Sequence, residues 1–124
     1  MARYTFLTWD GAGNQPPAVG IAQALIERGH EVTFAGYANQ RAYFRARGFR
    51  FVLLEHASAA WQELPPPSMF AVKLHAAWAA SEHLPDVQNV LANEQPDALL
   101  VDCLMFGALA AMESAGVPTM VLVQ

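Results

Sequence analysis

The stretch that decides the fold runs from Tyr4 to His30 and reads YTFLTWDGAGNQPPAVGIAQALIERGH. Its first part, 4–9, is rich in β-branched and aromatic residues without polar alternation, which is typical of a strand buried on both faces of a parallel sheet. Gly11 and Gly13 allow the sharp turn that follows, and the paired prolines after them favour the start of a helix. With the next strand expected at 30–35, the stretch predicts a β-α-β unit. Its glycine loop lies where open α/β sheets usually bind ligands.

Beyond this unit the sequence continues to alternate between strand and helix patterns. Further strands are expected at 49–54, 98–101 and 117–123, and further helices at 40–47, over 70–78, from Pro85 onward and at 104–114. The segment 55–67 shows no regular period and ends in three prolines, so we expect it to be irregular and flexible. The pattern predicts a single α/β domain over residues 1–124 with parallel strands.

Composition argues against several classes of protein. The seven Lys and Arg against eleven Asp and Glu give a net charge of −4, which disfavours nucleic acid or an anionic membrane as the main partner. The most apolar run, 98–112, is interrupted by Asp102, so it does not reach the length a bilayer requires. Cys103 is the only cysteine, which excludes an internal disulfide and favours a cytoplasmic location. No metal site is expected, because His75 and His83 lack the spacing of a two-histidine metal motif.

The end of the chain carries its own signal. Residues 117–123 read as a buried strand with nothing after it, whereas complete domains usually end in polar surface residues. We therefore expect this chain to be the amino-terminal piece of a longer protein.

The glycine loop also contains part of a dinucleotide-binding signature, Gly11-Ala12-Gly13 between a strand and a helix. The full signature requires a third small residue where Pro16 stands and an acidic residue at the end of the second strand. That strand ends instead in Ala35-Gly36-Tyr37. Both confirming features are missing, so an NAD-dependent enzyme is the less favoured alternative.

Two longer stretches resemble family 1 glycosyltransferases of the GT-B fold, which include bacterial enzymes that attach sugars to antibiotics and other natural products. The first joins GNQPP at 13–17 to ERGHEVTF at 27–34. The second joins PDALLVD at 96–102 to AGVP at 115–118, in the order that the family shows. Together they cover nearly all of this chain, but they match only the first part of a family member.

The resemblance implies a three-layer, Rossmann-like domain whose parallel sheet has the strand order 3-2-1-4-5. It also implies that this domain holds the acceptor, while a second, carboxyl-terminal domain holds a nucleotide-sugar donor and no cofactor is needed. In many family members a histidine in the first glycine loop takes the proton of the acceptor hydroxyl, and an aspartate after the fourth strand orients that histidine. Asp102 matches the aspartate, whereas Asn14 stands at the histidine position.

Asn14 changes the expected chemistry. An amide can orient an acceptor by hydrogen bonds, but it has no basic lone pair that titrates near neutral pH. Three interpretations stay open: another group (Asp10, Asp102 or, less favoured, His56) is the base, the acceptor needs no strong base, or transfer activity is lost. Asp10 and Asp102 are the predicted catalytic residues. Each also has a purely structural interpretation, Asp10 as a loop residue bonded to nearby backbone N–H groups and Asp102 as the cap of the following helix.

The predicted substrate-binding residues lie in or near the loops after the first and third strands. They are Trp9, Gly11, Gly13, Asn14, His56 and Trp61. Trp61, in the irregular segment, fits an apolar acceptor pocket better than Trp78, whose helical spacing core packing explains equally well. His30 begins the second strand at the far end of the sheet, and we expect it to be structural.

The favoured function is the acceptor-binding half of a glycosyltransferase that moves a sugar to a hydroxyl of a small apolar molecule. The 124 residues alone are expected to be inactive, because the half that binds the donor is absent. The alternative is a non-catalytic α/β binding or assembly module, which Asn14 favours. Pairing of two chains through an exposed sheet edge stays open.

Overall fold

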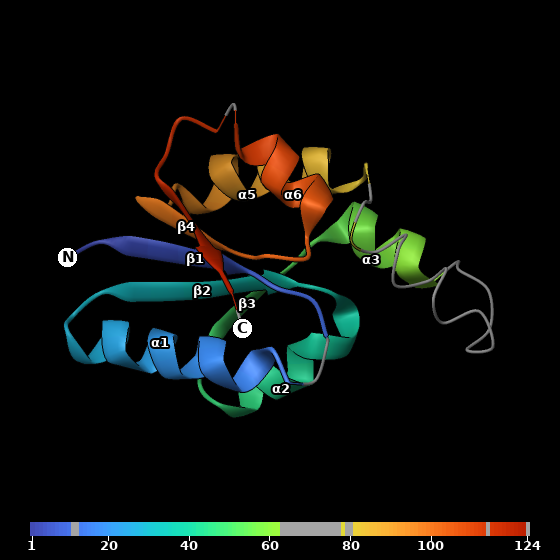
Figure 1. The fold of residues 1–124 in the computed structure, drawn as a ribbon. Coiled ribbons are helices and arrows are strands. Elements are labelled where there is room, and N and C mark those ends of the chain that lie inside the picture. Colours follow the sequence, from blue (N-terminus) through green and yellow to red (C-terminus); the bar gives the residue numbers. More distant parts are fainter. Residues whose placement is uncertain (11–12, 63–77, 79–80, 114, 124) are drawn as a thin grey trace.

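A computed structural model describes residues 1–10, 13–62, 78, 81–113 and 115–123. These residues form a five-stranded parallel sheet with helices on both faces (Figure 1). The strands are β1 (Arg3–Leu7), β2 (Glu31–Gly36), β3 (Arg50–Leu53), β4 (Ala98–Asp102) and β5 (Thr119–Leu122). The helices are α1 (Gln15–Glu27), the 3₁₀ helix η1 (Ala38–Gln40), α2 (Arg41–Ala46), α3 (Glu55–Gln62), α5 (His83–Glu94) and α6 (Phe106–Met112).

The strand order is β3-β2-β1-β4-β5, which confirms the predicted Rossmann-like arrangement. β1 lies at the centre, where Phe6 is in register with Phe34 of β2 and with Leu100 of β4. Because all strands are parallel, the loops that follow β1, β2, β3 and β4 leave the sheet at one edge. We call this the carboxyl edge; the candidate site lies there.

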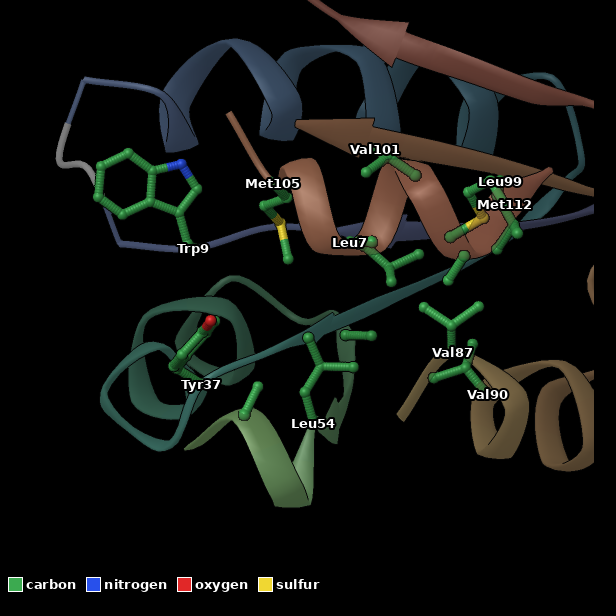
Figure 2. Packing of buried hydrophobic residues seen from close by; sticks show 14 residues of the cluster. Leu7, Trp9, Tyr37, Leu54, Val87, Val90, Leu99, Val101, Met105 and Met112 are labelled. Atoms are coloured by element: carbon green, nitrogen blue, oxygen red, sulfur yellow. The ribbon is translucent and has the colours of Figure 1, made fainter. Parts of the chain in front are cut away.

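Successive side chains of the central strands enter two different core layers, as the period of a strand requires. Phe6 and Phe34 pack with α1 and α2 on one face of the sheet. Leu7 and Val101 pack on the other face, in the cluster that includes α5 and α6 (Figures 1 and 2). Strands covered on both faces explain the continuous apolar runs in the sequence.

Glycines follow the last turns of α1 and α2, at Gly29 and Gly48. Their φ angles are +87° and +82°, a left-handed conformation that favours glycine. These stops return the chain to the sheet after α1 and α2.

The expectation of an irregular segment at 55–67 is wrong for its first part, which forms α3. The cause is a contact distant in sequence: the carboxylate of Asp86 accepts the backbone N–H groups of His56 at 3.0 Å and Ala57 at 2.8 Å. These are among the N–H groups that the first turn of a helix cannot satisfy internally. Residues 63–67, the rest of this segment, lie outside the part of the chain that the structure describes. The same holds for residues 70–77 of the helix expected over 70–78.

Candidate functional site

A buried carboxylate joins the loops after β1 and β4 at the carboxyl edge. Asp102 Oδ1 accepts a hydrogen bond from Trp9 Nε1 at 3.2 Å, and Asp102 Oδ2 accepts one from Asn14 Nδ2 at 3.0 Å. Asp102 is 2% exposed and Asn14 is 7% exposed. The two residues therefore lie side by side in the interior of this edge.

A turn at the end of β4 fixes the Asp102 side chain. Its Oδ1 also accepts the backbone N–H of Leu104 at 3.0 Å, and its carbonyl oxygen accepts that of Met105 at 3.0 Å. Helix α6 begins only at Phe106, so the interpretation of Asp102 as a helix cap is wrong: it closes a turn before the helix. The surrounding N–H donors offset the cost of burying a carboxylate.

Asn14 uses both hydrogens of its amide nitrogen at this contact. Nδ2 donates to the carbonyl oxygen of Trp9 at 2.8 Å and to Asp102 Oδ2 at 3.0 Å. Because both partners only accept, the orientation of the amide follows from the hydrogen bonds. The side chain thus ties the loop after β1 to the end of β4, directly before α1 begins.

A small hollow of about 10 Å³ opens next to this pair. It is lined by Trp9, Asp10, Tyr37, Asn39 and Trp61. The rings of Tyr37 and Trp61 meet edge to face with their centroids 6.0 Å apart, and Figure 2 shows Trp9 and Tyr37 at the same end of the core cluster. The hollow combines aromatic walls with the exposed carboxylate of Asp10.

Two glutamines connect Asp10 to the interior. Gln15 Nε2 donates to Asp10 Oδ1 at 3.3 Å, and Gln40 Nε2 donates to Gln15 Oε1 at 3.1 Å. Both glutamines are buried. Neither was predicted from the sequence, since a glutamine at a helix start or in a short turn has no pattern that separates it from surface glutamines.

The hydroxyl of Tyr37 forms a hydrogen bond with a histidine of α5. Its hydroxyl lies 2.9 Å from His83 Nε2, and both side chains are buried. Burial lowers the pKa of His83, and nearby Asp86 and Glu82 oppose this shift only in part. Burial also raises the pKa of Tyr37. The Tyr37 hydroxyl and a neutral His83 imidazole therefore share a hydrogen bond in the interior, and His83 is a packed histidine.

His56 lies apart from the hollow. Its Nδ1 is 2.8 Å from Asp86 Oδ1, so its side chain points to α5 and is half exposed. Five of the predicted residues come together at the carboxyl edge: Trp9, Asp10, Asn14, Trp61 and Asp102. Gly13 precedes α1 with open space around it, and Gly11 lies outside the described residues.

The opposite end of the sheet holds a wider, polar hollow. Its lining includes Arg3, Glu31, Arg50, Glu94 and His30. The charges are paired, Arg3 with Glu31 at 3.1 Å and Arg50 with Glu94 at 2.7 Å. His30 Nδ1 accepts the backbone N–H of Ala2 at 3.0 Å, so its expected structural role is confirmed.

Two features are absent from the described residues. No group of three or more His, Cys, Asp or Glu side chains in that part of the chain is arranged to hold a metal ion. None of its helices has both the length and the apolar character that crossing a membrane requires.

Comparison with known proteins gives a result at the level of structure. No protein-family model and no curated protein matches the sequence. Solved structures do match: the glycotransferase of kitacinnamycin has a TM-score of 0.73 at 22% identity, over 97% of this chain and 30% of that chain. The glycosyltransferase SnogD from Streptomyces nogalater has a TM-score of 0.72 at 20% identity, over 98% of this chain and 33% of that chain. The calicheamicin glycosyltransferase CalG4 has a TM-score of 0.67 at 23% identity, over 98% of this chain and 32% of that chain.

The chain has the same fold as one part of these glycosyltransferase structures. The expected resemblance to glycosyltransferases of the GT-B type is confirmed for the arrangement of the backbone. The chain spans about a third of the length of these structures.

Proposed function

We propose that this chain is the acceptor-binding part of a glycosyltransferase. In the proposal the acceptor is a small apolar molecule with a hydroxyl, and a second domain supplies the nucleotide-sugar donor. The observation that carries it is the contact between Asn14 and Asp102 at 3.0 Å, next to an aromatic hollow at the carboxyl edge. Ligands of open α/β sheets bind at this edge. One of the matched structures, VinC, is a glycosyltransferase in complex with DTDP.

The proposal gives Asp10 and Asp102 different roles. Asp10 is exposed in the hollow, where its carboxylate takes the proton of the acceptor hydroxyl. As the proton leaves, the hydroxyl oxygen bonds to the anomeric carbon of the sugar and the bond to the nucleoside diphosphate breaks, which inverts that carbon. Asp102 is buried behind Trp9 and Asn14, so its contribution is to hold these two residues in place.

Trp9 and Trp61 are the proposed walls for the apolar body of the acceptor. Aromatic side chains with a few well-placed polar groups are typical of small-molecule sites. Asn39, which is exposed at the same hollow, is placed to hydrogen bond with a polar group of the acceptor.

A non-catalytic binding module is the second candidate, and Asn14 is the observation that favours it. Both hydrogens of its amide are used within the protein, and an amide takes up no proton near neutral pH. If Asp10 does not act as a base, the edge binds a ligand without transferring a sugar.

Acceptor binding can be tested with 2-naphthol, an apolar aromatic alcohol, and isothermal titration calorimetry on the 124-residue chain. We expect saturable binding that Trp61→Ala weakens about tenfold or more, because one wall of the hollow is lost. Phe106→Ala is the matched control, since Phe106 is an exposed aromatic residue that does not line the hollow. Equal affinities in the wild type and Trp61→Ala would contradict the assigned pocket.

Transfer can be tested in a chimaera in which the rest of VinC follows this chain, with a thymidine diphosphate sugar as donor and 2-naphthol as acceptor. We expect transfer by the chimaera and none by the 124 residues alone. Asp10→Asn should lower kcat about a hundredfold or more. Glu27→Gln, at the last residue of α1, is the charge-matched control and should leave kcat unchanged.

The two candidate functions predict different outcomes. Equal kcat for Asp10→Asn and Glu27→Gln would show that Asp10 is not the base. A wild-type chimaera without activity, combined with an active Asn14→His chimaera, would favour the binding module.

A further inference from the structure

A continuous chain of hydrogen bonds runs from the backbone at the end of β2 to the carboxylate of Asp10. The N–H of Tyr37 donates to Gln40 Oε1 at 2.8 Å, and Gln40 Nε2 donates to Gln15 Oε1 at 3.1 Å. Gln15 Nε2 then donates to Asp10 Oδ1 at 3.3 Å. The chain joins β2, η1 and α1 to the loop after β1.

The two ends of this chain determine its direction. A backbone N–H can only donate, so Gln40 must turn its oxygen to Tyr37 and its nitrogen to Gln15. Gln15 must then present its oxygen to Gln40, which leaves its nitrogen for Asp10. An ionised carboxylate only accepts, so every donor in the chain meets an acceptor when Asp10 is ionised.

The surroundings of Gln40 are built to hold this orientation. Gln40 is fully buried, and its Nε2 has Thr8 Oγ1 as a further acceptor at 3.1 Å. A Cβ atom at Gly36 would collide with Gln40 Oε1, so glycine makes room for the amide. The close approach at Gly36 is independent of the hydrogen bonds and indicates one fixed position for the Gln40 side chain.

We infer that Gln40 is a positioning residue for Asp10, acting through Gln15. This inference rests on the proposed function, in which Asp10 accepts the proton of the acceptor. Gln40 fixes which end of the Gln15 amide faces Asp10, and the Gln15 amide in turn fixes the plane of the carboxylate. The pair thus keeps the proton acceptor oriented in the hollow before the acceptor arrives.

Few other titratable groups face Asp10 from the described elements. Tyr37 is the titratable side chain that lines the hollow with Asp10, and burial keeps its hydroxyl neutral. Asp102 is separated from the hollow by the Trp9 indole that donates to it. No Lys, Arg or Glu is among the described lining residues.

The test is Gln40→Glu, which alters no atom in contact with Asp10. The new carboxylate accepts from Tyr37 N–H and also from Gln15, which forces the Gln15 amide to turn its oxygen to Asp10. We expect the titration midpoint of the Asp10 carboxyl to rise relative to the wild type, because a donor to the carboxylate is replaced by an acceptor and a negative charge is added nearby. The midpoint is read by NMR on protein labelled with ¹³C at aspartate, with Asp10→Asn to assign the signal.

Gln23→Glu is the matched control. Gln23 is exposed on α1, so this variant adds the same charge to the same helix and should leave the Asp10 midpoint unchanged. Equal midpoints in the wild type and a folded Gln40→Glu would overturn the inference, as would equal shifts in both variants.

A second measurement covers the case in which Gln40→Glu does not fold. In the wild-type chain the side-chain amide signals of Gln15 and Gln40 should both shift with the Asp10 midpoint, and these shifts should vanish in Asp10→Asn. A Gln40 amide signal that ignores the titration of Asp10 would overturn the inference. Failure of this inference can be distinguished from failure of the proposed function, because neither NMR measurement depends on sugar transfer.

Discussion

At the scale of single residues, the pair of Asn14 and Asp102 separates two roles that a histidine would combine. The amide supplies the hydrogen bonds that a buried carboxylate requires, at 3.0 Å to Asp102 and 2.8 Å to the Trp9 carbonyl. It supplies no base. The structural part of the contact is present in this chain, and in the proposed function a different group takes the proton.

Removing the Asn14 amide should destabilise the fold. Asn14→Ala leaves the buried Asp102 without one of its donors, so the free energy of unfolding should fall by about 1–3 kcal/mol. Asn89→Ala, on the exposed side of α5, is the control and should change stability by less than about 0.5 kcal/mol. Urea unfolding followed by circular dichroism measures both. Equal losses would show that the Asn14 contact contributes no net stability.

His83 should make stability depend on pH. Because burial lowers its pKa below the ordinary value of 6.5, the unfolded chain binds a proton that the folded chain does not. The His83 contribution is therefore complete above pH 6.5 and is lost as the pH falls through that value toward the folded pKa. Its slope reaches at most about 1.4 kcal/mol per pH unit.

The measurement compares wild type with His83→Gln in urea at pH 7.5, 6.5 and 5.5. Below the ordinary histidine pKa, the wild type should lose stability faster than the variant as the pH falls. Curves that stay parallel over the whole range would contradict a neutral buried His83.

At the scale of elements, the ends of helices and strands are set by contacts between segments distant in sequence. Asp86 of α5 holds the first N–H groups of α3, and Gln40 of η1 occupies the space beside Gly36 at the end of β2. Such contacts decide where an element begins, and they also bring its first or last residues to the carboxyl edge.

Two glycines allow this dependence to be tested. Gly36→Ala should lower the free energy of unfolding by about 1–3 kcal/mol, because its Cβ would displace the Gln40 amide. Gly20→Ala, within α1 and with open space around it, should raise stability by about 0.5–1 kcal/mol. Thermal unfolding of both variants gives the comparison. A neutral Gly36→Ala would mean that the Gln40 pocket adapts at no cost.

At the scale of the whole molecule, β5 differs from the other strands. It lies at the edge of the sheet, and Met120 and Val121 are 46% and 50% exposed. Neighbouring residues of a strand point to opposite faces, so β5 is partly exposed on both faces although Leu122 is buried, and the expectation of a buried strand at 117–123 is wrong. Exposed apolar edge strands promote association between chains.

A charge on β5 should reduce such association. We expect the 124-residue chain to show concentration-dependent association in sedimentation velocity, and Val121→Lys to lower it. Ile26→Lys is the control, because Ile26 is similarly exposed on α1, away from the sheet edge. A chain that stays monomeric at high concentration, or an equal effect of both lysines, would argue against pairing through β5.

The order in which strands and helices follow one another could be predicted from sequence patterns alone, and the three layers were expected from the family resemblance. Apolar runs, helical spacing and glycines at the ends of helices are local signals, because each depends on residues that are close together in the sequence. The two aspartates and the glycine loop were also predicted, because residues that directly follow parallel strands must reach the same edge. Residues 13–34 and 96–118 resemble a known family. This resemblance added the expectation that the loops after the first and fourth strands meet.

Only the tertiary structure decided how the side chains at that edge are used. Asp102 is buried and accepts hydrogen bonds from Trp9 and Asn14, whereas Asp10 is exposed. His56 contacts Asp86. Gln40 is connected to Asp10 through Gln15. These pairs join loops and helices that the sheet brings together. The physical reason is that a hydrogen bond forms or fails with differences of a few tenths of an ångström in the distance between donor and acceptor. Sequence patterns specify only which face or edge a residue occupies.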